Sequence, residues 1–136
     1  MIISLSAALA LALQSAPVAA PPASGAEPQS APIASLDELP IEQATGPRCA
    51  IAFAVVSRWQ KSGDPRGANY ADLEAAGGRE FFVQAMAVLM DATGMTREQM
   101  SALAFYEVGQ LDNPDGEKRL AAMMPACLLL KQSAGL

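Results

Sequence analysis

The side chains in this sequence that are capable of chemistry are carboxylates, methionines and two cysteines, because the chain contains no histidine. Ser-His-Asp and Cys-His catalysis, histidine-ligated zinc and a CxxCH haem attachment are therefore excluded. Glu80 and Asp91 are about three helical turns apart, roughly 16 Å along a helix. Glu98 and Glu107 fall on the polar face of another predicted helix. These positions predict solvated charges, so we expect no catalytic residue and a non-enzymatic protein.

Two further patterns resemble metal sites and fail on inspection. The methionines at 86, 90, 123 and 124 are soft donors of the kind that hold Cu(I). Methionine at helical spacing, however, more often fills gaps in a core. The acidic run from Asp112 to Glu117 resembles a calcium loop, but a register set by Gly116 places Leu111 and Ala122 at the first and last ligand positions. We expect neither a metal nor a cofactor.

The overall composition limits the classes of partner that the protein can bind. The chain has 136 residues, enough for one domain, with a net charge of −5 and an isoelectric point near 4.6. Phosphate backbones and anionic lipid headgroups both attract basic surfaces, so this acidity argues against nucleic acid and against docking on a membrane.

The N-terminus has the pattern of an export signal. Residues 2–13 form an apolar run that is too short to cross a bilayer but matches the apolar region of a signal peptide. We predict a signal peptide over residues 1–20, with cleavage after Ala26 as the alternative. Residues 21–34 are rich in Pro, Ala and Ser and predict a disordered linker. The helical domain then covers 35–136, with no stable membrane insertion after cleavage.

The elements that must position any site are helices. The stretch from Pro47 to about Lys61 is apolar on all sides and predicts a central helix, with Pro47 at its first position. Apolar residues at helical spacing predict three more helices: one ending at Gly94, one capped by Thr96, and one capped by Asn113. A short helical lead-in is expected over 69–76, and Pro125 predicts a kink or a break in the last helix.

No segment has the alternating pattern of a strand, so the predicted class is all-α: a small four-helix bundle, most simply up-down-up-down. In such a bundle Cys49 and Cys127 lie at the same end of adjacent helices. Two cysteines that meet in an exported chain most simply form a disulfide. The alternative is two separate buried thiols, which are common as small core residues.

Residues 47–133 carry a resemblance to a group of known proteins. It rests on the Arg79-Glu80-Phe81-Phe82 stretch, on the run from Met90 to Gly94, and on the bracketing cysteines. The segment is similar to small exported all-helical proteins of Gram-negative bacteria, a group that implies no activity. In size, acidity and a single disulfide the chain also resembles the periplasmic acid-stress chaperones of the HdeA type, a likeness of architecture only.

From these observations we expect a periplasmic or secreted module that binds an unknown protein partner through a helical surface, in a chaperone-like manner. The alternative is a carrier for a small apolar ligand. Its pocket would lie between the helices and be lined by Phe53, Phe82, Met86 and Met124.

Overall fold

The computed structural model describes residues 31–136, and in this range the chain is helical and contains no strand. Four α-helices are preceded or separated by two short 3₁₀ helices: η1 (Leu36–Glu38), α1 (Ile41–Ser62), η2 (Pro65–Asn69), α2 (Gly78–Thr93), α3 (Arg97–Leu111) and α4 (Pro114–Ser133). The predicted class, a small all-α four-helix fold with one disulfide, is confirmed. The predicted signal peptide and most of the linker lie outside the described residues.

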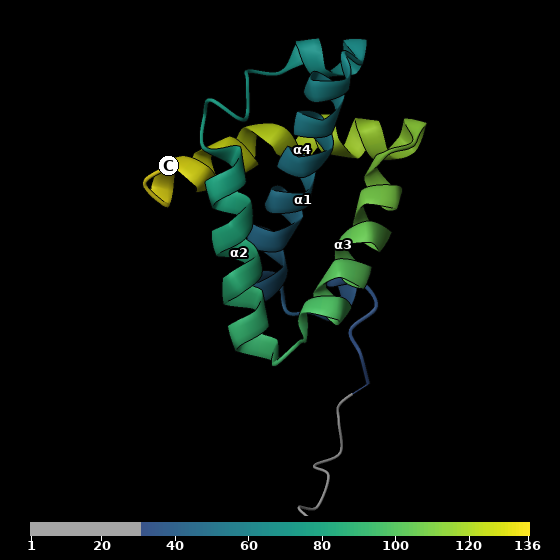
Figure 1. Cartoon of the computed structure of the whole chain (residues 1–136), viewed down its shortest axis with the longest axis vertical. Coiled ribbons are helices and arrows are strands. Elements are labelled where there is room, and N and C mark those ends of the chain that lie inside the picture. Colours follow the sequence, from purple (N-terminus) through teal and green to yellow (C-terminus); the bar gives the residue numbers. More distant parts are fainter. Residues whose placement is uncertain (1–30) are drawn as a thin grey trace, which may run out of the picture.

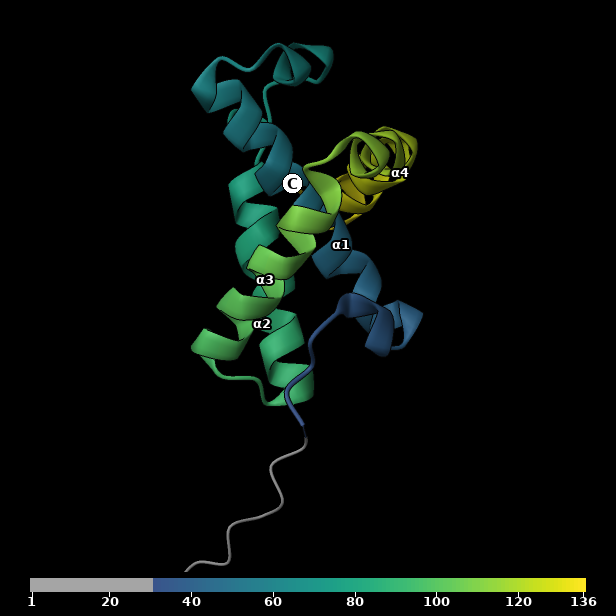
Figure 2. The ribbon, with the colours of Figure 1, turned by 90° about the vertical axis from the view of Figure 1, so that its right-hand side faces the viewer.

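Helix α1 is the centre of the fold, as its uninterrupted apolar sequence predicts. The side chains from Cys49 to Val56 are buried except for that of Ala54. Helices α2 and α3 run along α1 on either side, and α4 passes across the other three, as Figures 1 and 2 show from two directions. Phe53 and Phe81 meet edge to face, with ring centroids 5.4 Å apart, and join α1 to α2.

The first helix begins earlier than predicted. Pro47 lies inside α1, which begins at Ile41, six residues before it. The carbonyl of Pro40 accepts from the amides of Gln43 and Ala44, so the first turn forms upstream of Pro47. Because Pro47 has no N–H, one helical hydrogen bond is lost at this point. Its ring is buried, and this packing offsets part of the loss.

The disulfide between Cys49 and Cys127 is present and joins α1 to α4. The two residues are buried, at 4% and 1% exposure. Because α1 begins at Ile41, Cys49 lies well inside the helix and not at its start. The bond therefore fastens α4 where it crosses α1, in the interior of both helices.

The predicted caps of the later helices are confirmed. Thr96 and Gln99 form a capping box at the start of α3, and the Asn113 side chain accepts from the Gly116 amide at the start of α4. Gly94 ends α2 in the left-handed conformation. Pro125 does not break the last helix, since α4 runs without interruption from Pro114 to Ser133.

One carboxylate that the sequence places in solvent has a structural partner. Glu107 on α3 accepts hydrogen bonds from the Leu36 amide at 2.7 Å and from the Ser35 hydroxyl at 3.1 Å. It thus holds η1 against α3, while Ser35 and Glu38 form a capping box at the start of η1. Ile33, at the end of the predicted linker, already packs against the core.

Candidate ligand-binding pocket

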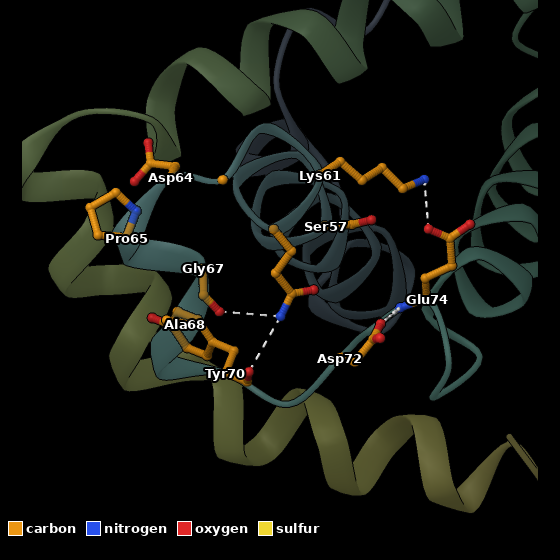
Figure 3. Close-up of a pocket in the computed structure, with 11 residues that line it drawn as sticks. Ser57, Lys61, Asp64, Pro65, Gly67, Ala68, Tyr70, Asp72 and Glu74 are labelled. Atoms are coloured by element: carbon orange, nitrogen blue, oxygen red, sulfur yellow. Dashed lines mark hydrogen bonds and ion pairs between the residues drawn. The ribbon is translucent and has the colours of Figure 1, made fainter.

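The connection between α1 and α2 is folded back against α1, and one glutamine holds it there. The Gln60 amide donates to the carbonyls of Gly67, Tyr70 and Ala71 and accepts from the amide of Leu73. Figure 3 shows two of these bonds. A Cβ on Gly67 would lie 2.7 Å from the Gln60 backbone nitrogen, so only glycine allows this close approach.

The far end of the connection is anchored by α4. The Lys131 side chain is buried, at 6% exposure, and its ammonium donates to the Ala76 carbonyl at 2.6 Å. Between the two anchors, Asp72 accepts from the amides of Glu74 and Ala75. Residues 73–77 form hydrogen-bonded turns, residues 70–72 are irregular, and the short helix predicted over 69–76 is absent.

A second cluster fastens η2 to the junction of α3 and α4. The Arg66 guanidinium lies 4.4 Å from the centre of the Trp59 ring and pairs with Asp64, Asp112 and Glu117. The hydrogen bond from the Arg66 side chain, followed by the one from its backbone amide, lowers the pKa of Asp64 to about 2. The hydrogen bond to Asp64, followed by the one to Glu117, raises the pKa of Arg66.

The Asp64–Arg66 pair predicts a loss of stability in acid. The pKa of this carboxyl is 3.8 when free and about 2 in the fold, so the pair stabilises the protein at pH values above the free pKa. This contribution is lost as the pH falls from about 4 towards 2. We expect Asp64→Asn, which keeps an acceptor for the Arg66 amide, to flatten the fall in melting temperature over this range.

The comparison uses thermal unfolding from about pH 5 to pH 2. Asp91→Asn is the matched control, because Asp91 is exposed and this substitution changes the net charge by the same amount. If the Asp64→Asn profile runs parallel to those of the parent and of this control, the pair does not contribute.

These anchors create a hollow between α1, the connection and α2, which we call the α1–α2 pocket. It has a volume of about 390 Å³, within the range of small-molecule sites. The residues that line it combine apolar and cationic side chains: Phe53, Ala54, Ser57, Arg58, Lys61, Leu73, Glu74, Gly78, Arg79 and Phe82. Leu73 is 2% exposed and reaches the core from the connection.

A neighbouring hollow of about 470 Å³ lies on the other side of the connection, between α1 and η2. Figure 3 shows its lining, with Lys61 and Glu74 paired at 3.0 Å. Ser57, Lys61 and Glu74 line both hollows. The ion pair therefore stands between them.

Comparison with family models, with curated proteins and with solved structures finds no match. The residue roles below therefore rest on geometry. Within residues 31–136 no three acidic or cysteine side chains are grouped to hold a metal ion. In the same range no helix is long and apolar enough to cross a bilayer.

The structure brings together two of the four residues predicted to line a pocket. Phe53 and Phe82 line the α1–α2 pocket, one from each helix. Met86 and Met124 are buried in the core, at 7% and 4% exposure, and do not line it. Methionine at helical spacing thus fills the interior here.

Sequence reasoning did not identify the cations of the pocket. It also did not identify the wall of the pocket, which is the part of the connection over residues 70–77. Arg58 and Lys61 are three residues apart, a spacing that puts both on one side of a helix and was available as a signal. Arg79 and Leu73 carried no comparable signal. Leu73 is the one large aliphatic residue between positions 63 and 77, and the four hydrogen bonds of Gln60 hold the surrounding connection against α1.

Proposed function

We propose that the protein is an exported, non-enzymatic binding module that holds a small ligand with an apolar body in the α1–α2 pocket. The observation that carries this proposal is the shape of the pocket: an apolar floor of Phe53, Leu73 and Phe82 beneath an anchored wall. Binding sites of this kind are largely preformed and mostly apolar, with a few polar groups at defined positions. Gln60 and Lys131 supply the anchors, so the wall is in place before a ligand enters.

Export is part of the same proposal. A disulfide persists in oxidising compartments and is rare where thiols are kept reduced, so the Cys49–Cys127 bond supports a periplasmic or secreted location. The apolar run over residues 2–13 supports a cleaved signal peptide. Protein recovered from the exporting host should lack this segment and show the mass of the oxidised form.

The test of binding uses a neutral apolar dye, Nile red, and a variant that fills the pocket. Ala54 lines the pocket from α1, so Ala54→Phe should remove the increase in dye fluorescence that the parent protein gives. Ala87→Phe is the matched control, because Ala87 is exposed on α2 and does not line the pocket. Equal dye binding by both variants, or none by the parent, would contradict the proposed site.

A second function is favoured by one observation. Phe105 on α3 is 79% exposed and its neighbour Tyr106 is 49% exposed. Aromatic side chains dominate the energy of many protein interfaces, so a protein partner would use this face of α3. Phe105→Ala should abolish capture of such a partner in a crosslinking experiment and leave dye binding unchanged.

A further inference from the structure

The charge of the α1–α2 pocket is opposite to that of the protein. The whole chain has nine cationic and fourteen acidic residues, which gives the net charge of −5. The pocket is lined by three of those cations, Arg58, Lys61 and Arg79, and by one acid, Glu74. The balance at the pocket is therefore 3 − 1 = +2. An acidic protein thus has a local site that attracts an anion.

The three cations are not equally available. Arg58 is paired with Asp112 at the end of α3, so its charge is already offset. Arg79 forms no ion pair with any residue from 31 to 136, is exposed, and lines the pocket. A guanidinium presents two parallel N–H groups, which match the two oxygens of a carboxylate.

Lys61 is the second available cation. Its partner Glu74 lies at 3.0 Å, but the two side chains are 60% and 59% exposed. An exposed pair of this kind contributes little to stability, so a competing carboxylate can replace Glu74 at little cost.

We propose that the ligand of the α1–α2 pocket is an apolar monocarboxylate. Its hydrocarbon part packs on Phe53, Leu73 and Phe82, and its carboxylate is bound by Arg79 and, after Glu74 is displaced, by Lys61. This assignment rests on the proposed function and specifies the class of ligand. Arg79, which needs no partner to be displaced, is then the main residue that distinguishes an acid from a neutral molecule of the same shape.

The test compares octanoate with octanol, which share a hydrocarbon chain and differ in charge. Both are titrated into the labelled protein, and amide chemical shifts are followed by NMR. We expect octanoate to bind about tenfold more tightly, the effect of one charge-assisted contact. Arg79→Gln should remove most of this preference, with Lys61 keeping the remainder, and should change the affinity for octanol much less.

Two further variants make the result specific. Arg97→Gln is the matched control, since Arg97 is exposed on α3 and outside the pocket and the net charge changes equally. Glu74→Gln should strengthen octanoate binding, because it removes the carboxylate that competes with octanoate for Lys61. Equal affinities for the two ligands, or equal effects of Arg79→Gln and Arg97→Gln, would overturn the assignment.

The two proposals fail in different ways. If Ala54→Phe blocks Nile red and octanol but octanoate has no advantage, the pocket is a binding site and the carboxylate assignment is wrong. If Ala54→Phe changes the binding of none of the three molecules, the pocket itself is not the site.

Discussion

Reduction of the Cys49–Cys127 bond is expected to lower the free energy of unfolding by about 4 kcal/mol. The two residues are 78 positions apart, so the bond restricts a long loop of the unfolded chain. A domain of this size has a total stability of about 5–15 kcal/mol, and the bond therefore accounts for a large share of it. Denaturant unfolding of the oxidised and the reduced protein measures the difference.

The reduced parent protein is the matched control for the variant Cys49→Ala/Cys127→Ala. It keeps both buried sulfur atoms and loses only the bond, whereas the variant also loses their packing. We expect the variant to be less stable than the reduced protein. A difference below about 1 kcal/mol between the oxidised and reduced forms would mean that the crossing of α1 and α4 holds without the bond.

The caps show why much of the fold was predictable from the sequence. Thr96 with Gln99, and Asn113 with Pro114, satisfy the first amides of a helix by contacts within four residues. Such signals depend on local sequence and do not require the rest of the chain. The starts of α3 and α4 were therefore predicted at the correct residues.

Pro47 shows where local reasoning fails. The same residue suits the first position of a helix and also a buried position inside one, and its own neighbours do not decide between these. In the structure the decision comes from tertiary packing, because Ala44 and Pro47 are both buried. The disulfide itself was predicted correctly, but from a bundle in which Cys49 stands at the start of its helix. In the structure Cys49 lies inside α1, and the bond joins the interiors of the two helices.

The candidate site was predicted in part for a similar reason. Phe53 and Phe82 belong to periodic helices, whose inward faces can be read from spacing. Leu73 and the wall depend on Gln60, whose four bonds reach across a connection that has no periodic pattern. Met86 and Met124 have the same helical spacing as the two phenylalanines. Spacing alone does not distinguish residues that line a pocket from residues that fill the core.

The junction of α3 and α4 gives the last large prediction. Gly116 lies in the first turn of α4, where its amide donates to the Asn113 side chain at 3.0 Å. A Cβ at this position would lie 2.3 Å from the Gln110 carbonyl oxygen and 2.6 Å from the Leu111 Cα. Both are backbone atoms of α3, so they cannot move away without shifting the end of that helix.

Gly116→Ala is therefore expected to lower the free energy of unfolding by about 2–3 kcal/mol, the cost of forcing apart two packed backbones. Gly109→Ala is the matched control, because a Cβ on Gly109 in α3 meets nothing within 4 Å. There alanine should stabilise the helix by about 0.5–1 kcal/mol through its higher propensity. Denaturant unfolding should thus give opposite signs for the same substitution. If both variants are stabilised, helix propensity dominates at Gly116 and α4 does not pack against the α3 backbone as closely as described.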